Sequence, residues 1–289
     1  MPGLYRIYAQ PAASILSATS GFIRQAGFTH SLTPARNCTF ACTYCYVPTM
    51  RIYGGLKTED WQRWGQFTTF KENAPALLAR AVKPHMLIYC SPLVDPYQPA
   101  ESEQQLMPHL LEVLLHRPPA VFTIQTRGPL ILRDLPLLQE LHRRTSLRIS
   151  FSITTDNDAL RRLYEPHCAP ISQRLATIER LHSAGLAVHA TLAPLLPCDP
   201  IRLLDAVLRV TAEPVVGDPL HLRETKRHGA TTREQAFRIA DHHAHREWFQ
   251  PEFQARIVEQ MKQHAARRGR RFAVGPEGFR WLTFSTNSE

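Results

Sequence analysis

The chain has 289 residues, of which 44% are apolar, so it can bury the core of one large α/β domain or two small ones. It contains no run of about 18 apolar residues and no apolar leader with a cleavage site, so we expect neither a membrane-spanning helix nor a secretory signal. Its net charge of +9 favours an anionic partner, nucleic acid included. We therefore expect a cytoplasmic protein whose six cysteines stay reduced and serve metal binding or chemistry rather than disulfides.

Six short segments are apolar and rich in β-branched or aromatic residues, which predicts strands buried on both faces. In chain order, these strands are expected at 28–32, 86–90, 121–126, 147–153, 186–192 and 214–217. Apolar residues at helical spacing fill the intervals between strands, at 74–82, 103–116, 135–144, 173–185 and 200–210. Gly185 is expected to end the fourth of these helices, because glycine readily adopts the left-handed conformation of a helix stop.

The alternation of strands and helices predicts a parallel sheet with helices outside it, either barrel-like or doubly wound. After Asp218 the sequence becomes rich in Arg, His and Glu, with helical runs at 231–246 and 251–268. We therefore divide the chain into an N-terminal segment at 1–27, a barrel or sheet domain at 28–217 and a C-terminal extension packed on it at 218–289.

Polar residues, prolines and glycines collect directly after the predicted strands. The stretch "SPLVDPYQP" follows the second strand, "TRG" the third, "TTDND" the fourth and "APLLPCDP" the fifth. Functional sites of barrels and of open α/β sheets are built at this carboxyl edge. We therefore expect the site of this protein there.

Three cysteines lie in the stretch "RNCTFACTYCYVP" after the first strand, at Cys38, Cys42 and Cys45. Their spacing would form one stripe on a helix, but Pro34, Pro48 and the poor helix formers between them favour a loop. A loop with three thiolates can contribute to a zinc site, which commonly takes four ligands. It can also hold a four-iron cluster and leave one iron with an open coordination site.

The C-x3-C-x2-C spacing, with Tyr44 before the last cysteine, resembles the radical S-adenosylmethionine superfamily. The stretches "SLTPARNCTFACTYCYVP", "DPYQPAE", "TRGPLILRD", "SITTD" and "YEPHCAPISQRL" resemble its subgroup related to spore photoproduct lyase, often described as DNA-repair photolyase-like. The resemblance extends from about Ser31 to Pro197 and fades beyond that point.

This resemblance implies an α/β fold with a six-stranded partial βα (TIM-like) barrel, followed by a C-terminal helical extension. It implies a 4Fe-4S cluster on Cys38, Cys42 and Cys45, whose open iron binds S-adenosylmethionine. An electron from a donor such as flavodoxin or ferredoxin would cleave S-adenosylmethionine and give a 5′-deoxyadenosyl radical for hydrogen abstraction. The resemblance and the positive charge together suggest that the substrate is a nucleic acid, DNA included. The resemblance also implies a lyase-like reaction.

Several further residues match positions at which the family binds its cofactor. Asp95 and Gln98 would hold the amino group of S-adenosylmethionine, and Arg127 would pair with its carboxylate. Ser152 and Thr154 would hydrogen-bond its ribose or carboxylate. Each also has a structural interpretation: a rigid turn for Asp95, a surface cation for Arg127, and bonds within the strands for the two hydroxyls.

One aromatic side chain and one thiol complete the candidate site. Tyr44 is expected beside the adenine or, alternatively, in plain loop packing. Cys90 ends the second strand and is the candidate to return a hydrogen atom to the product, with a buried strand cysteine as the alternative. Glu165 and Arg174 are expected to form an ion pair that braces the top of the barrel.

A protein of another class fits the same residues: a non-catalytic nucleic-acid-binding protein with a structural zinc at the cysteine loop. The densest positive run, at 262–271, is either a phosphate contact or solvated surface. His242, His243 and His245 are expected on the solvated surface of a helix rather than at a metal. Metal content separates the two classes, since one predicts four irons with sulfide and the other a single zinc.

Overall fold

The computed structural model describes residues 5–49, 63–222 and 234–284. An eight-stranded sheet has the order β11-β10-β9-β8-β7-β6-β3-β2 and is parallel except for the antiparallel pair β2 and β3. Its strands are β2 (Leu16–Ala18), β3 (His30–Leu32), β6 (Leu87–Cys90), β7 (Val121–Thr126), β8 (Ser146–Ser152), β9 (Val188–Leu195), β10 (Val215–Pro219) and β11 (Phe272–Val274). The first and last strands of this order do not pair with each other, so the sheet is an open, partial barrel.

All six predicted strands are confirmed, as β3, β6, β7, β8, β9 and β10 in consecutive order across the sheet. The segments that predicted them are buried on both faces, as the adjacent residues Ser150 and Phe151 of β8 illustrate, each with 0% exposure. Two short strands, β2 and β11, add one strand at each edge. The choice between a barrel and a doubly wound sheet is settled in favour of the partial barrel.

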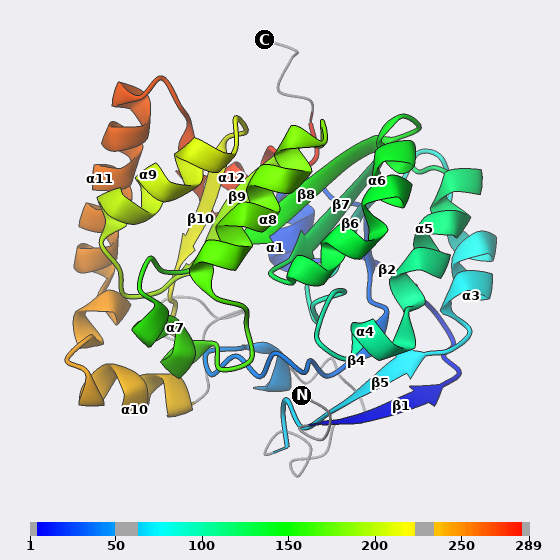
Figure 1. Cartoon of the computed structure of the whole chain (residues 1–289), viewed down its shortest axis with the longest axis horizontal. Coiled ribbons are helices and arrows are strands. Elements are labelled where there is room, and N and C mark those ends of the chain that lie inside the picture. The colour runs from blue at the N-terminus through cyan, green and yellow to red at the C-terminus, as the bar shows by residue number, and fades with distance from the viewer. Residues whose placement is uncertain (1–4, 50–62, 223–233, 285–289) are drawn as a thin grey trace.

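Helices cover the outer face of this sheet. Within the described residues, the helices are α1 (Gly21–Gln25), α3 (Ala74–Ala81), α4 (Glu101–Gln104), α5 (Leu106–His116), α6 (Leu135–His142), α7 (Asp158–Tyr164), α8 (Ile171–Ser183), α9 (Pro200–Val210), α10 (Glu234–His242), α11 (Pro251–Arg267) and α12 (Gly275–Arg280). Figure 1 shows α5, α6, α8 and α9 side by side in front of the strands. Short 3₁₀ helices lie at η1 (Val47–Thr49), η2 (Pro129–Asp134) and η3 (Arg246–Phe249).

The helix boundaries follow from local chemistry. Helix α9 begins after Asp199, whose carboxylate accepts hydrogen bonds from the backbone N–H groups of Ile201 and Arg202, both at 3.0 Å. Helix α8 ends before Gly185, which has φ +83° and therefore the left-handed conformation predicted for it. Of the predicted helix at 231–246, residues 231–233 lie outside the described part of the chain.

A second, three-stranded sheet has the order β1-β5-β4, with β1 at Arg6–Gln10, β4 at Ala35–Arg36 and β5 at Phe67–Lys71. It lies below the barrel in the view of Figure 1. Strand β4 leads directly into the cysteine loop, so this sheet adjoins the loop. This second sheet was not predicted from the sequence.

The C-terminal segment is built into the barrel as well as packed on it. Strand β11 pairs with β10, and α12 contacts both strands. On the inner face, α1 and α12 enclose a second apolar cluster formed by Ala26, Phe28, Tyr89, Val216, Phe279 and Leu282. Thr123 on β7 donates a hydrogen bond to the carbonyl of Leu282 at 2.8 Å. Within the described residues, no helix is long and apolar enough to cross a membrane.

The basic run at 262–271 is largely engaged in contacts within the protein. Arg270 donates hydrogen bonds to the carbonyls of Leu208, Thr211 and Glu213, at 3.3, 2.7 and 3.0 Å. Its guanidinium thus binds carbonyl groups at and beyond the C-terminus of α9, where the backbone carbonyls have no hydrogen-bond donor within the helix. Arg268 pairs with Asp205 at 3.2 Å. This part of the run serves to hold the C-terminal segment against α9.

Replacing Arg270 with Ala should lower the free energy of unfolding by about 1–3 kcal/mol, because three carbonyls lose their charged donor. Urea unfolding followed by circular dichroism measures the change. Arg267→Ala is the matched control, since the exposed Arg267 donates a hydrogen bond to the carbonyl of Gln263 within its own helix, at 3.3 Å. Equal effects of the two substitutions would contradict a structural role for Arg270.

Candidate active site

The cysteine motif forms a loop between β4 and η1, so the loop prediction is confirmed. Asn37 and Ala41 have left-handed conformations, with φ of 66° and 56°, which break any helix across the motif. The side chain of Asn37 accepts a hydrogen bond from the backbone N–H of Cys38 at 2.8 Å. Cys38 and Cys42 are 8% exposed, and Cys45 is half-buried.

Neighbouring segments hold the loop tightly from two sides. Gly65, with φ +90°, approaches so closely that a Cβ built on it would lie 2.3 Å from the Cβ of Ala41. On the other side, the side-chain carbonyl of Gln98 accepts hydrogen bonds from the backbone N–H and hydroxyl of Thr39, at 2.8 and 3.1 Å. The backbone N–H of Thr43 donates to the carbonyl of Tyr164 at 2.9 Å. These contacts fix the loop at the carboxyl edge of the sheet.

A fully buried carboxylate, that of Glu165, joins the loop to the barrel. It accepts hydrogen bonds from Arg174 and Arg127, each at 2.5 Å, and so forms two ion pairs. The hydroxyls of Tyr44 and Thr154 also donate to it, at 2.5 and 2.8 Å. The predicted ion pair of Glu165 with Arg174 is confirmed, and the carboxylate gathers three of the predicted site residues around it.

The charges of this cluster are set by pairing rather than by burial. Burial raises the pKa of Glu165, but the guanidinium groups of Arg174 and Arg127 outweigh it and lower the pKa to about 2. The carboxylate is therefore ionised at neutral pH. Arg127 also donates to the sulfur of Cys42 at 3.5 Å, so a fixed cation lies beside one thiol of the motif.

Cys168 lies beside the motif, although it was not among the predicted site residues. The sulfurs of Cys42 and Cys168 and a carboxylate oxygen of Glu165 all lie within 4.8 Å of one another. A hydrogen bond with Cys168 is the largest cause that lowers the pKa of Cys42, and Arg127 adds to it against the effect of burial. The only sequence signal was that Cys168 follows Glu165 closely in "YEPHCAP".

The donor set of the loop can be compared with the two metal centres expected for it. Four thiolates around one zinc ion lie about 3.8 Å apart, because each Zn–S bond is about 2.3 Å long. In the described part of the chain, the only such convergent group is that of Cys42, Glu165 and Cys168, and it leaves out Cys38 and Cys45. The carboxylate of that group is already taken by two arginines. Three spread thiols therefore fit a polynuclear cluster better than a single ion.

The loop after β6 carries two predicted cofactor ligands, and both are engaged with the protein. The carboxylate of Asp95 accepts hydrogen bonds from Tyr97 N–H, the Thr126 hydroxyl and Arg127 N–H, at 2.9, 2.6 and 2.8 Å. Asp95 thereby ties the end of β6 to the end of β7. The side-chain nitrogen of Gln98 is buried and has no hydrogen-bond acceptor among the described residues, so it remains an available donor.

Close approach of the same two loops requires a glycine. A Cβ built on Gly128, just after β7, would lie 2.3 Å from the carbonyl oxygen of Tyr97. No side chain fits in that space. The position of Arg127 at the site therefore depends on the glycine that follows it.

Ser152 belongs to a polar row on the inner face of the barrel. Its hydroxyl accepts a hydrogen bond from the side-chain NH₂ group of Gln125 at 2.7 Å. The side-chain carbonyl of Gln125 accepts hydrogen bonds from the hydroxyls of Tyr89 and Ser150, at 2.7 and 2.6 Å. The backbone carbonyl of Ser152 also accepts from Arg174 at 3.0 Å. Ser152 is thus linked to the Glu165 cluster through Arg174.

Cys90 lies apart from the cluster, fully buried at the end of β6. Side chains alternate along a strand, so Cys90 lies on the face opposite Tyr89 and its inner polar row. Burial, followed by the charges of Asp95 and Glu101, raises the pKa of its thiol. The hydrogen-donor role of Cys90 stays a prediction.

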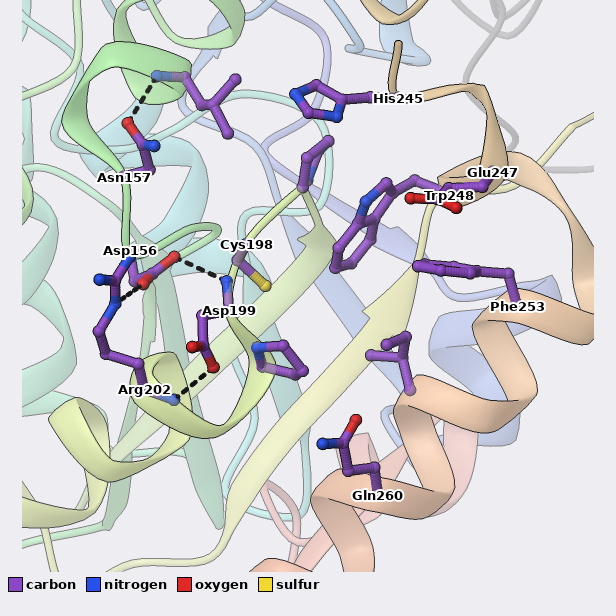
Figure 2. A pocket seen from close by; sticks show the side chains of 14 residues that line it. Asp156, Asn157, Cys198, Asp199, Arg202, His245, Glu247, Trp248, Phe253 and Gln260 are labelled. Carbon is purple, nitrogen blue, oxygen red and sulfur yellow. Dashed lines mark hydrogen bonds and ion pairs between the residues drawn. The ribbon is translucent and has the colours of Figure 1, made fainter. Parts of the chain in front are cut away.

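A cavity of about 530 Å³ opens where the ends of β8 and β9 meet the C-terminal segment. Figure 2 shows Asp156 and Cys198 on the barrel side, facing Trp248 and Phe253. Asp156 forms an ion pair with Arg202 and accepts a hydrogen bond from the backbone of Asp199 at 3.1 Å. The polar stretches predicted after the fourth and fifth strands therefore line one cavity, with aromatic residues from the C-terminal segment opposite.

The fold and this site define a class, the open α/β barrels with a cysteine loop at the carboxyl edge of the sheet. The family model of the Radical SAM superfamily matches residues 32–208, which is more than half of the chain. The chain belongs to the Radical SAM superfamily. Members of this superfamily use a 4Fe-4S cluster and S-adenosylmethionine.

Curated relatives include Uncharacterized protein Mb2609c of Mycobacterium bovis, 29% identical over 210 residues, which cover 69% of this chain and 61% of the relative. Uncharacterized protein ORF301 of Acidianus two-tailed virus is 26% identical over 210 residues, which cover 67% of each chain. The chain thus spans less than two thirds of the mycobacterial relative.

Among solved structures, the fold is similar to spore photoproduct lyase complexed with dinucleoside spore photoproduct. The TM-score is 0.63 at 13% identity, over 93% of this chain and 81% of the other. A variant of that lyase with bound AdoMet and the same dinucleoside gives a TM-score of 0.64 at 12% identity, over 93% and 81% of the two chains. At such identities the likeness shows the fold, and it confirms the predicted partial barrel.

Replacing Glu165 with Gln should lower the free energy of unfolding by about 3–5 kcal/mol at neutral pH, because the buried Arg174 and the half-buried Arg127 lose their countercharge. The folded pKa of about 2 lies below the ordinary value of 4.5, so this stabilisation is complete above pH 4.5 and is lost as the pH falls toward 2. Urea unfolding at several pH values measures the difference between the wild type and the variant, which should shrink below pH 4.5.

The control for this charge is Glu140→Gln. Glu140 is a glutamate at the surface paired with Arg143 and Arg144, so its replacement should change stability little. An equal loss in both variants, or a difference from wild type that grows as the pH falls, would contradict the role given to Glu165.

Replacing Cys168 with Ala should leave the iron and sulfide content after anaerobic reconstitution unchanged, because Cys168 lies outside the motif loop. Cys42→Ala should lose most of both, and Cys198→Ala, at the distant cavity, should match the wild type. Iron and sulfide assays on the three purified variants measure this. A loss of iron in Cys168→Ala alongside Cys42→Ala would make Cys168 a ligand and remove the open coordination site.

Proposed function

We propose that this chain is a radical S-adenosylmethionine enzyme in which Cys38, Cys42 and Cys45 hold a 4Fe-4S cluster. The observation that carries the proposal is the seating of a three-cysteine loop against the buried Glu165 cluster at the carboxyl edge of a partial barrel. Family membership supports it independently. When bound, the cluster supplies the electron that cleaves the sulfonium of S-adenosylmethionine into methionine and a 5′-deoxyadenosyl radical.

In this proposal the residues around the loop position the cofactor and exclude water. Arg127 pairs with the cofactor carboxylate from its fixed place on Glu165, and Tyr44 packs beside the adenine. Gln98 offers its unused amide donor, while Asp95 orients the two loops that carry Gln98 and Arg127. Because Arg127 is already held in position, little free energy is needed to reorganise it when the cofactor carboxylate binds.

Thr154 and Ser152 take the ribose side of the proposed cofactor site. The hydroxyl of Thr154 donates a hydrogen bond to the Glu165 carboxylate at 2.8 Å, so the orientation of this hydroxyl is fixed. Ser152, at the end of β8, accepts from Gln125 and keeps its own proton for a further acceptor. Both hydroxyls can therefore serve as ordered partners for the ribose.

The substrate we propose is a nucleic acid, DNA included, and the reaction is a lyase-like one that begins with hydrogen abstraction. The net charge of +9 supports an anionic substrate. We assign substrate choice to the C-terminal extension, whose Trp248 and Phe253 form one wall of the cavity. Cys90 is the proposed donor that returns hydrogen to the product.

The cell must supply the electron and keep the thiols reduced. A flavodoxin or ferredoxin is the proposed donor, because the cluster needs a one-electron reductant. We propose the reducing cytoplasm as the location, where the six cysteines serve metal binding or chemistry rather than disulfides. The three-part division at 1–27, 28–217 and 218–289 remains our proposal for the organisation of the chain.

The alternative function is a non-catalytic nucleic-acid-binding protein with a structural zinc. The convergence of Cys42, Glu165 and Cys168 within 4.8 Å is the observation that favours it. Against it stand the two arginines that already neutralise Glu165. The two functions differ in the metal that is bound, iron with sulfide or zinc, and in whether S-adenosylmethionine is cleaved.

Anaerobic reconstitution with iron and sulfide, followed by dithionite and S-adenosylmethionine, tests the proposal through the formation of 5′-deoxyadenosine. The wild type should form it, and Cys42→Ala should not. Cys90→Ala should form it as well, and should lose only the return of hydrogen to a substrate. A wild type that binds one zinc and forms no 5′-deoxyadenosine would overturn the proposal in favour of the binding protein.

A further inference from the structure

The small sheet β1-β5-β4 has one face turned to the core and one turned outward. In the register of the sheet, Ile7 is paired with Thr68, and both Thr68 and Phe70 are buried. The alternate residues therefore form the outward row, because side chains on neighbouring strands at paired positions share a face. This outward row, called here the β1-β5-β4 face, consists of Arg6, Tyr8, Gln10, Arg36, Phe67, Thr69 and Lys71.

Two aromatic rings lie on this face. Tyr8 is 41% exposed and is one of two large apolar side chains that the described chain exposes to this degree. It makes an edge contact with Phe67, with 6.2 Å between ring centroids. The guanidinium of Arg63 lies over the Phe67 ring, 5.4 Å from its centroid. An exposed aromatic ring thus stands next to a cation-covered one.

The rest of the β1-β5-β4 face is positive. It carries Arg6, Arg36 and Lys71, and the three strands contain no aspartate or glutamate. None of these cations forms an ion pair with another residue in the described part of the chain. Burial, followed by the charge of Arg36, lowers the pKa of Lys71 to about 8, and its ammonium donates a hydrogen bond to the carbonyl of Ser14 at 3.0 Å.

This face adjoins the cysteine loop. Arg36 is the last residue of β4, two positions before Cys38. The hydroxyl of Thr68 donates to the carbonyls of Arg36 and Asn37, both at 3.1 Å, so β5 holds the start of the loop directly. A ligand bound across the face would be held next to the candidate active site.

We propose that the β1-β5-β4 face binds single-stranded nucleic acid, with a base stacked on Tyr8 and phosphates paired with Arg6, Arg36 and Lys71. Aromatic platforms within positive grooves are the common device for single strands, since every base has a stacking face. A duplex would bury its bases and leave Tyr8 without a partner. The proposal rests on the proposed function only in taking this strand as the substrate, because the binding itself needs no radical chemistry.

Fluorescence anisotropy with labelled oligothymidylate of about 12 nucleotides tests this proposal on the full, reconstituted chain. Tyr8→Ala should weaken binding about tenfold, whereas Tyr8→Phe, which keeps the ring, should stay within about twofold. Arg6→Gln should lessen the slope of log affinity against log salt by about 0.7, the contribution of one phosphate contact. An oligouridylate of equal length tells RNA from DNA as the source of the strand.

The matched control is Arg209→Gln, which removes one exposed cation from α9, far from this face in Figure 1. It should leave binding unchanged. Wild-type affinity in Tyr8→Ala, or an equal loss in Arg209→Gln and Arg6→Gln, would overturn the proposal. Basal formation of 5′-deoxyadenosine, measured on the same samples, should be the same in Tyr8→Ala and wild type. Its absence from both would refute the proposed enzyme without touching the binding result.

Discussion

The buried carboxylate of Glu165 is the group on which the candidate site depends. It connects four segments that are far apart in the sequence: the cysteine loop through Tyr44, β7 through Arg127, β8 through Thr154 and α8 through Arg174. Burying one charge alone would cost several kcal/mol, but two arginines and two hydroxyls satisfy this one. The loop conformation and the barrel edge are therefore stable only together, and the β1-β5-β4 sheet holds the same loop from its other end.

Much of the fold could be predicted from the sequence, because the period and composition of its segments match their burial. The segments that form β7 and β8 are short and rich in β-branched, aromatic and aliphatic residues, and they are largely buried on both faces, as parallel strands covered on both sides require. The edge strands could not be predicted in this way. Strand β4 has two residues and β11 three, too few to show a period, and each exists because a distant segment supplies its hydrogen bonds.

The site could be predicted only in part, for a similar reason. Proline and poor helix formers indicated the loop around Cys42, and the stretch "YEPHCAPISQR" suggested that Glu165 pairs with Arg174. The contact of Cys42 with Cys168 depends on how α7 and the loop after it pack on the barrel, and no local pattern records that. For Asp95, the sequence indicated a cofactor ligand or a turn, whereas its oxygens cross-link two strand ends. Residue type predicts chemistry, but tertiary packing decides which partner receives it.

The inner apolar cluster has a consequence for how the barrel forms. Its residues come from both ends of the described chain: the hydroxyl of Thr283 donates to the carbonyl of Ala26 at 3.3 Å, and Thr123 reaches the carbonyl of Leu282. During synthesis, the inner face of β6 to β10 thus stays uncovered until residues 272–283 have left the ribosome. Contacts of such long sequence separation slow folding and expose apolar surface meanwhile. The inner apolar cluster of this barrel therefore cannot close until β11 and α12 have been made.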